Sequence, residues 1–89
     1  MQITLSRTFE KQLKRVPSHI VDKVYSWLWS LKSKGLRKTQ LTPGLHDEPL
    51  QGKRWGQRSI RLNKSYRLIY KIVRDEVQIE LLEVNKHDY

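Results

Sequence analysis

The sequence predicts a single α+β domain with the element order β-α-α-β-β-β. Two amphipathic segments with helical spacing occupy the first half of the chain, and three short runs rich in Ile, Leu, Val and Tyr follow in the second half. Helices and strands that are segregated along a chain in this way form α+β domains. We therefore expect a sheet of four strands with both helices packed on one face and the other face open. The 89 residues suffice for one compact core, so residues 1–89 are expected to be one domain.

The first strand and the first helix are indicated by the opening residues. Residues 2–5 (QITL) alternate polar and apolar side chains, as a half-buried strand does. Ser6 or Thr8 can cap a helix over roughly residues 8–16, and Pro17 ends it. One face of this helix has apolar residues at the spacing i, i+4, i+7, namely Phe9, Leu13 and Val16.

The second helix is predicted from Ser18, its expected cap, to Gly35, which supplies a left-handed stop. Its apolar face consists of Ile20, Val24, Trp27 and Leu31, joined by Val21 and Leu28. Trp27 and Trp29 lie on opposite sides of the helix, so at most one of them faces the core. Because the link around Pro17 is so short, we expect the two helices to form an antiparallel hairpin.

The second half of the chain contains the remaining strands. Residues 36–57 are interrupted by Pro and Gly and are expected to form loops and turns. The three strands are predicted at residues 58–62 (RSIRL), 66–73 (YRLIYKIV) and 77–84 (VQIELLEV). The segments between them, Asn63-Lys64-Ser65 and Arg74-Asp75-Glu76, have the length of hairpin turns.

Charge is the strongest compositional signal. The chain has 18 Lys and Arg against 9 Asp and Glu, a net charge of +9. Residues 51–75 hold eight Lys and Arg and one Asp, whereas residues 76–89 hold one Lys and four acidic residues. A basic stretch of this kind, set among aromatic residues, favours nucleic acid as the partner, although a merely solvated surface remains the alternative.

Other features exclude several classes of protein. Without cysteine there is neither a disulfide nor a thiolate nucleophile. No P-loop, nucleophile elbow or metal-ligand spacing occurs, so we predict no metal and no cofactor. No apolar run has the length of a membrane span, and the opening residues lack the apolar stretch of a signal peptide. We expect a soluble, cytoplasmic protein without membrane contact.

Two arginines are the first candidates for chemistry. If Asn63-Lys64-Ser65 is a three-residue turn, Arg61 and Arg67 lie directly opposite one another on one face of the sheet. Two guanidiniums in that position suit the oxygens of a phosphate. A four-residue turn would shift the register and separate them. In a purely structural alternative, Arg67 forms a salt bridge with Glu80 or Glu83 on the next strand.

Histidine, tyrosine, carboxylate and tryptophan side chains add further candidates. His87 and Tyr89 end the chain shown, and an imidazole can exchange a proton near neutral pH. His19 and His46 are interpreted as bystanders, one in a helix and one in a loop. Asp47 and Glu48 precede a basic cluster, where pairing with arginine is favoured over a role as general base. Trp55 either stacks on unpaired bases or belongs to the core, and the core is favoured.

The stretch EPLQGKRWGQRSIRLNKSYRLIYKIVRDEVQIELLEVNKH resembles the second half of the RelE/ParE superfamily of toxins from bacterial type II toxin–antitoxin modules. The shared features are a P-L-x-G turn, the S-I-R-L and Y-R-L-I-Y strands, a short acidic turn and a last strand that ends V-x-K-H. The opening F-x-K-x-L-K-R-V-P helix is also similar, so the resemblance covers nearly the whole chain. It implies a helical hairpin packed on one face of a curved four-stranded sheet, as in microbial RNases.

The resemblance also implies an activity. RelE-like members enter the ribosomal A site and cut messenger RNA, whereas ParE-like members poison DNA gyrase. We favour the cutting branch, in which the ribose 2′-hydroxyl attacks the adjacent phosphodiester and leaves a cyclic phosphate. That metal-independent reaction needs a base for the hydroxyl, cationic donors for the phosphate oxygens and an acid for the departing oxygen.

The resemblance assigns roles to five residues. Arg67 matches the arginine that binds the phosphate, and Arg61 matches a second basic residue of that site. His87 occupies the place of an acid or charge stabiliser. Glu48 resembles the general base of the YoeB-like subgroup, although the loop around it differs in length, and Tyr89 resembles a terminal tyrosine of that subgroup. His87 and Tyr89 as a pair match no single subgroup. The candidate RNA contacts are Lys53, Arg54, Trp55, Arg58, Lys64 and Lys86.

These assignments imply partners and leave alternatives. The implied partners are messenger RNA on the ribosome (16S rRNA, A site) and an acidic antitoxin that covers the cationic surface. A gyrase poison and a non-catalytic RNA-binding module are the competing hypotheses.

Overall fold

The computed structural model describes residues 1–74 and 78–86. The element order is β1 (Gln2–Leu5), α1 (Arg7–Leu13), α2 (Ser18–Lys34), α3 (Leu36–Gln40), β2 (Glu48–Pro49), a short 3-10 turn η1 (Gly52–Arg54), β3 (Gln57–Arg61), β4 (Tyr66–Val73) and β5 (Gln78–Lys86). None of the helices in the described part of the chain is long and apolar enough to cross a membrane. The α+β class is confirmed.

The sheet has five strands in the order β1-β5-β4-β3-β2, not the four expected. β1 runs parallel to β5, and the other neighbours are antiparallel. The fifth strand is β2, which pairs with the first part of β3 in a segment that was expected to be loop. The same segment contains α3, a further helix that was not expected. Both elements are too short to produce a periodic pattern in the sequence.

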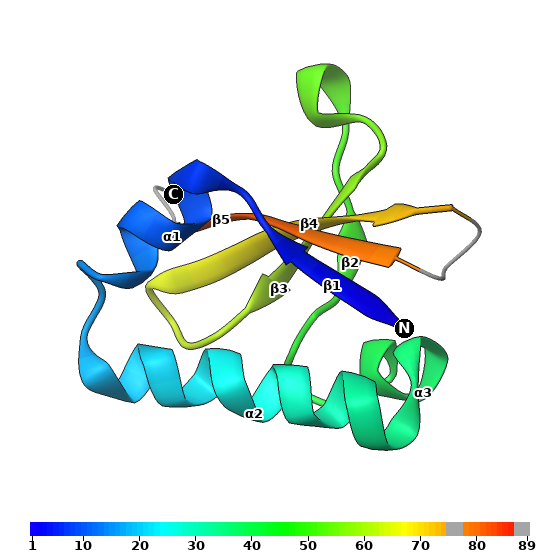
Figure 1. The fold of residues 1–89 in the computed structure, drawn as a ribbon, viewed down its shortest axis with the longest axis horizontal. Coiled ribbons are helices and arrows are strands. Elements are labelled where there is room, and N and C mark those ends of the chain that lie inside the picture. Colours follow the sequence, from blue (N-terminus) through cyan, green and yellow to red (C-terminus); the bar gives the residue numbers. More distant parts are fainter. Residues whose placement is uncertain (75–77, 87–89) are drawn as a thin grey trace.

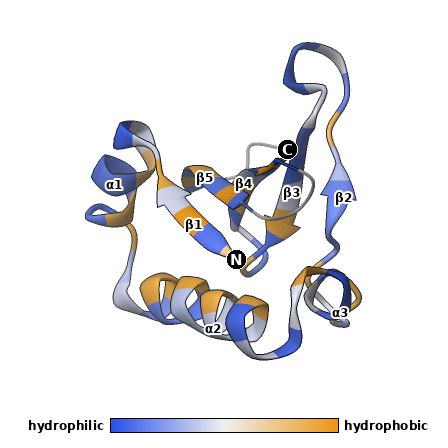
Figure 2. Ribbon diagram, turned by 45° about the vertical axis from the view of Figure 1, so that its right-hand side comes forward, coloured by the Kyte–Doolittle hydropathy of each residue, from blue (hydrophilic) through white to orange (hydrophobic). Residues whose placement is uncertain are grey.

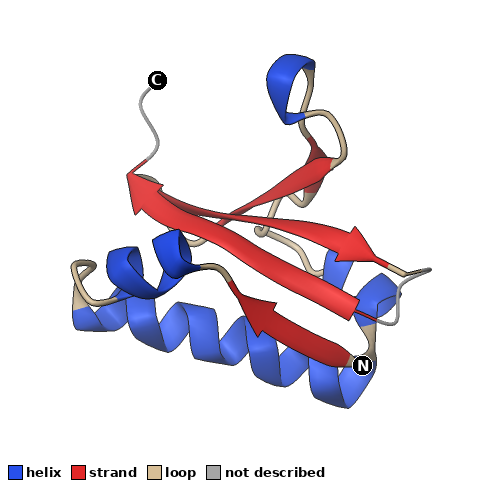
Figure 3. Ribbon diagram, turned by 45° about the horizontal axis from the view of Figure 1, so that its top comes forward, coloured by secondary structure: helices blue, strands red, loops and turns tan. Residues whose placement is uncertain are grey.

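One face of the sheet is covered by α2, and the other faces away from it. Figure 1 shows α2 lying along one side of the sheet, while the chain around η1 projects from the opposite side. The turned view in Figure 3 shows the same arrangement, with the strands lying between the long helix and the projecting segment. The sheet therefore has one helix-covered face and one open face.

The core forms between α2 and the helix-covered face. The apolar side of α2 is turned toward the sheet (Figure 2), and its buried residues match the predicted stripe. Trp27 packs on Tyr70 of β4, with ring centroids 5.0 Å apart. Trp29 is 72% exposed, which confirms that the two tryptophans lie on opposite sides of the helix. The core also contains Phe9, Leu36, Ile60, Leu62, Leu68, Ile79, Leu81 and Val84.

The ends of the two main helices follow local chemistry. Ser6 caps α1, since its Oγ accepts a hydrogen bond from the N–H of Phe9 at 3.0 Å. The helix ends at Leu13, earlier than expected, and residues just before Pro17 are disfavoured in a helix. Ser18 is the first residue of α2 and not its cap; Pro17 takes that position without a side-chain hydrogen bond. Gly35, at φ 86°, ends α2 as predicted.

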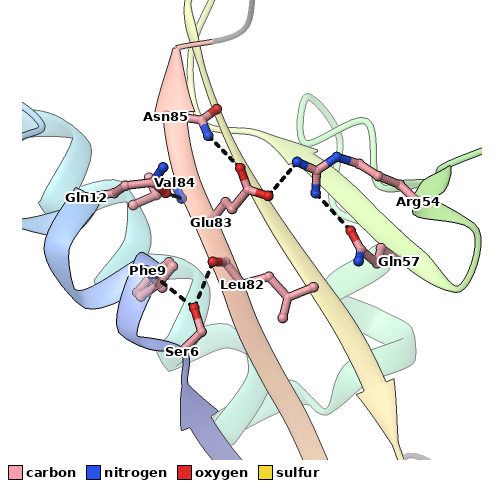
Figure 4. Close-up of polar contacts among 9 residues, drawn as sticks. All are labelled: Ser6, Phe9, Gln12, Arg54, Gln57, Leu82, Glu83, Val84 and Asn85. Carbon is pink, nitrogen blue, oxygen red and sulfur yellow. Dashed lines mark hydrogen bonds and ion pairs between the residues drawn. The ribbon is translucent and has the colours of Figure 1, made fainter.

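Side chains of α1 and its cap residue form hydrogen bonds with the backbone of β5 past the point where its pairing with β1 ends (Figure 4). β1 covers β5 only as far as Leu81. Beyond that point, Ser6 Oγ donates to the carbonyl of Leu82 at 2.8 Å, and Oε1 of Gln12 accepts from the N–H of Val84 at 2.9 Å. The pairing of β5 with β4 shifts by one residue here. Tyr70 of β4 is paired with Leu81, whereas the neighbouring Ile69 is paired with Glu83. Polar side chains of α1 and its cap thus replace a missing strand at a bulge.

Candidate active site

The turn between β3 and β4 decides which side chains lie opposite one another. Asn63 begins this turn, and its Oδ1 accepts hydrogen bonds from the backbone N–H groups of Ser65 and Tyr66, both at 2.8 Å. The turn has three residues, and Arg61 is paired with Arg67. The predicted register is therefore confirmed, and the alternative with a four-residue turn is wrong.

Both arginines point away from the core. Side chains alternate along a strand, and the neighbours Ile60 and Leu68 are completely buried under α2. Arg61 and Arg67 line a cavity of about 140 Å³, together with Glu48 of β2. Ser59, Tyr66, Leu50 and His46 complete its walls. Three of the five residues to which the resemblance assigns a catalytic role thus share one small cavity.

Arg67 lacks a protein partner within the described residues. Its Nε is buried and has no hydrogen bond there. The two acidic residues that could have paired with it have other partners: Glu80 lies 3.2 Å from Lys71, and Glu83 lies 2.5 Å from Arg54. The structural alternative for Arg67 is therefore wrong. A buried donor without a partner is costly.

The segment before β2 carries side chains to both sides of the sheet. The backbone N–H of Arg61 donates to the carbonyl of Leu45 at 2.7 Å, and Glu48 is paired with Ser59. Between these two contacts, the segment before β2 has two residues, His46 and Asp47, whereas β3 has one, Ile60. One residue is therefore extra, as in a β-bulge. His46 has a positive φ of 48°. His46 and Glu48 line the cavity, whereas Asp47 points into the protein.

Asp47 anchors this segment in a buried network. Its carboxylate has no exposed side-chain surface and accepts a hydrogen bond from Nε of Arg58 at 2.6 Å. The hydroxyl of Tyr70 donates to the other carboxylate oxygen at 2.5 Å, and Gln40 of α3 donates to that hydroxyl at 3.3 Å. The prediction that this carboxylate pairs with arginine is confirmed. The network joins α3, β3 and β4 to the residue next to Glu48.

The environment of this network shifts two pKa values. Burial, and then the hydrogen bond to the Asp47 carboxylate, raises the pKa of Tyr70 well above its usual value. Burial would lower the pKa of Arg58, but its hydrogen bond to Asp47 and the nearby negative charge outweigh that effect and raise it. Tyr70 therefore remains a neutral donor and Arg58 remains charged across the physiological range.

The projecting segment around η1 is tied to β5 by a surface ion pair (Figure 4). Arg54 contacts Glu83 and also donates to Oε1 of Gln57 at 2.9 Å, while Asn85 donates to the same glutamate at 2.9 Å. Trp55 is 81% exposed, so the favoured core interpretation of this residue is wrong. An exposed tryptophan next to basic residues remains available to a partner.

The predicted RNA contacts occupy different settings. Lys53 and Trp55 are exposed on the projecting segment, Lys64 is exposed in the turn after β3, and Lys86 is exposed at the end of β5. Arg54 and Arg58 are each engaged by an acidic side chain. The predicted catalytic residues His87 and Tyr89 lie outside the described residues.

Sequence reasoning did not associate His46 with the other site residues. It was interpreted as a loop bystander, yet it lines the cavity beside Glu48 and the two arginines. Ser59 and Tyr66 were likewise not singled out. The spacing of His46 and Glu48, two residues apart, is the one signal that could have placed them on the same side of an extended segment.

Comparisons with known proteins identify the fold and the family. The family described as "ParE toxin of type II toxin-antitoxin system, parDE" matches residues 3–88. No curated protein matches the chain. Among solved structures, a YoeB/ParE toxin from Agrobacterium tumefaciens is 19% identical with a TM-score of 0.78 and covers 99% of this chain and 100% of its own. YafQ from E. coli is 23% identical with a TM-score of 0.76 and coverages of 97% and 92%.

A third structure contains a partner protein. The YoeB-YefM complex from Staphylococcus aureus matches with 24% identity, a TM-score of 0.73 and coverages of 99% and 98%. At such identities the three structures establish a shared fold, and the family assignment rests on the match over residues 3–88. The chain therefore belongs to the ParE toxin family and is a toxin of a type II toxin–antitoxin system within the RelE/ParE superfamily.

Proposed function

We propose that this toxin is a ribosome-dependent endoribonuclease that cuts messenger RNA in the A site. The observation that supports this proposal is the pair Arg61 and Arg67, which share a cavity with Glu48 and have no ion pair within residues 1–74 and 78–86. Two cations without counter-ions repel one another unless an anion lies between them. A phosphodiester supplies that anion.

The proposed reaction assigns one task to each group. Glu48 accepts the proton of the ribose 2′-hydroxyl, whose oxygen then attacks phosphorus. Arg61 and Arg67 donate hydrogen bonds to the phosphate oxygens as negative charge accumulates, which is the main source of rate enhancement in such sites. His87 and Tyr89 are proposed to act from the last residues of the chain, as charge stabiliser or acid and as a stacking or proton-relaying phenol.

The open face around this cavity is proposed to hold the rest of the RNA and the ribosome. Lys53, Lys64 and Lys86 are exposed and can neutralise backbone phosphates. Trp55 can stack on an unpaired base. Arg54 can add a contact if its surface pair with Glu83 opens. Arg58 is not included, because Asp47 already binds its guanidinium.

A cell-free translation reaction tests this proposal. Wild-type toxin should stop synthesis of a reporter, and mapping of RNA 5′ ends should show cleavage within codons at stalled ribosomes. Glu48→Gln removes the base and should lower cleavage by about 10²–10⁴-fold. If the message stays intact while synthesis continues, the proposal is refuted.

A gyrase poison is the second candidate function, because the matching family is described as ParE. In that case the cationic face binds a protein or DNA, and no proton transfer is needed. A supercoiling assay with purified gyrase distinguishes the two functions. Inhibition of supercoiling that persists in Glu48→Gln, with no message cleavage by wild type, would establish the second candidate.

An acidic antitoxin is the proposed protein partner. The chain has a net charge of +9, and the homologous YoeB-YefM complex contains two proteins. A flexible acidic segment that folds over the open face would neutralise this charge and block the cavity. The product of a neighbouring small gene should co-purify with the toxin and prevent its activity. Failure of both would exclude that product as the antitoxin.

A further inference from the structure

His46 has a backbone conformation that its neighbours hold in place. Its φ of 48° is uncommon for a residue other than glycine, and such conformations persist where the surrounding structure determines them. On one side, the carbonyl of Leu45 accepts the N–H of Arg61 at 2.7 Å. On the other side, the Asp47 carboxylate is buried against Arg58 and Tyr70. Both neighbours of His46 are therefore fixed.

This conformation places the imidazole at the cavity. His46 and Glu48, two residues apart, lie on the same side of this segment, and both line the cavity with Arg61 and Arg67. The extra residue opposite β3 resembles a bulge, a feature that is common next to active sites. His46 is also exposed, so a bound RNA can reach it.

The cavity needs a proton donor, and its other side chains do not provide a good one. Arginine does not give up its proton in proteins, and serine and tyrosine hydroxyls are in general weaker acids than an imidazolium. Glu48 is already used as the base. An imidazole can give a proton near neutral pH and take it back in the next cycle. Among the described residues that line the cavity, His46 supplies the imidazole.

We infer that His46 is a further catalytic residue, which donates a proton to the departing 5′-oxygen of the RNA. The inference rests on the proposed ribonuclease function. In the step, the bond between the 2′-oxygen and phosphorus forms and the bond between phosphorus and the 5′-oxygen breaks. The 2′-hydroxyl proton goes to Glu48, and the imidazolium proton goes to the 5′-oxygen. The products are a 2′,3′-cyclic phosphate and a 5′-hydroxyl, and exchange with water resets both side chains.

A substrate with sulfur in place of the 5′-oxygen tests the role of His46. A thiolate leaves without protonation, because thiols are far more acidic than alcohols. The variant is His46→Asn, since asparagine accepts a left-handed backbone but does not act as an acid at neutral pH. On ribosome-bound message with the normal linkage, cleavage should fall by about 10²–10⁴-fold. On message with the sulfur-bridged linkage at the cleavage site, the variant should cut within a few-fold of wild type.

Three other variants provide reference rates on the two substrates for His46→Asn. Glu48→Gln should be slow on both substrates, because the 2′-hydroxyl still needs a base. His19→Ala changes an exposed histidine in the first turn of α2, and its rates should equal those of wild type. His46→Gly, which also accepts the left-handed backbone, should reproduce the pattern of His46→Asn.

The outcomes separate the two hypotheses. If wild type cuts neither substrate, the proposed ribonuclease function fails and the role of His46 fails with it. If wild type cuts both, but His46→Asn is impaired equally on both or on neither, the role of His46 alone is refuted. Rescue by sulfur in His87→Ala and not in His46→Asn would also refute it, because His87 would then be the donor.

Discussion

The two faces of the sheet use arginine in opposite ways. On the helix-covered face, Arg58 is bound by the buried Asp47 carboxylate, and Tyr70 satisfies the second oxygen of that carboxylate. On the open face, Arg61 and Arg67 lie opposite one another, and no ion pair with a described residue neutralises either. Arg58 and Arg61 stand on the same strand, three residues apart, so the alternation of side chains along β3 places them on opposite faces.

The comparison teaches which basic residues of this chain serve the fold and which serve a ligand. A cation bound to a buried counter-ion has little left for a partner, and its removal destabilises the folded state because the counter-ion is left uncompensated. A pair of cations without counter-ions costs stability and attracts an anion. Substitutions on the two faces should therefore separate stability from activity.

Among the substitutions that test this contrast between the two faces, the largest effect is expected for Arg67→Ala. Cleavage of ribosome-bound message should fall by about 10²–10³-fold, as it does when one charge-stabilising donor is removed from other active sites. The melting temperature should change little, because the Nε of Arg67 loses no protein hydrogen bond. Lys71→Ala, on the same strand but paired with Glu80, is the matched control and should cut at the wild-type rate. Equal cleavage by wild type and Arg67→Ala would show that Arg67 on the open face does not serve the proposed reaction.

A large effect on stability is expected for Arg58→Met. This change leaves the Asp47 carboxylate buried with Tyr70 as its remaining partner, and the free energy of unfolding should fall by about 2–3 kcal/mol. For a chain of this size, that corresponds to a decrease in melting temperature of roughly 8–24 °C. Arg61→Met, three residues along β3, should change the free energy of unfolding by only about 0.5 kcal/mol in either direction. Similar losses in both variants, measured by thermal or urea unfolding, would contradict the contrast.

A smaller effect, with a distinct pH dependence, is expected for Tyr70→Phe. Loss of the hydroxyl should lower the free energy of unfolding by about 1–1.5 kcal/mol at neutral pH. The pKa of Tyr70 is raised in the folded state, so its contribution is complete below the unfolded pKa of about 10 and is lost as pH rises toward the folded value. The difference between wild type and Tyr70→Phe should therefore shrink above pH 10. Tyr25→Phe, at an exposed tyrosine of α2, is the control and should leave the free energy of unfolding at neutral pH close to that of wild type.

The smallest effect is expected from inorganic phosphate. At about five times its dissociation constant, phosphate should raise the free energy of unfolding of the wild type by about 1 kcal/mol. Arg61→Met and Arg67→Ala should each lose this gain, whereas Arg58→Met should keep it despite its lower baseline. Titration of the melting temperature with phosphate at constant ionic strength measures the gain. A gain retained by Arg61→Met and Arg67→Ala would place the anion elsewhere.

The elements with clear periodicity were predictable from the sequence. β1 and β4 begin and end at the expected residues, and the buried face of α2 is the predicted stripe. The opposition of Arg61 and Arg67 was also predictable, because a three-residue turn leaves one register. These features depend on neighbours close in sequence.

The rest depends on contacts between distant residues. β2 has two residues, one of them Pro49, and exists because β3 pairs with it. The position of His46 at the cavity depends on the pairing of its segment with β3, through the hydrogen bond from the N–H of Arg61 to the carbonyl of Leu45. Whether Asp47 or Glu48 would pair with arginine depended on which face each reached, and only Asp47 reaches Arg58. The exposure of Trp55 depends on a segment that projects from the fold.

The parallel pairing of β1 with β5 has a consequence for the order of assembly during synthesis. Gln2 is aligned with Gln78, so the first strand to leave the ribosome waits for the last one before the sheet can close. Until then β4, which lies between β3 and β5, lacks half of its backbone partners. Contacts between such distant parts of a chain form slowly. A nascent polypeptide that ends before β5 cannot complete this sheet, so the toxin becomes competent only late in its own translation.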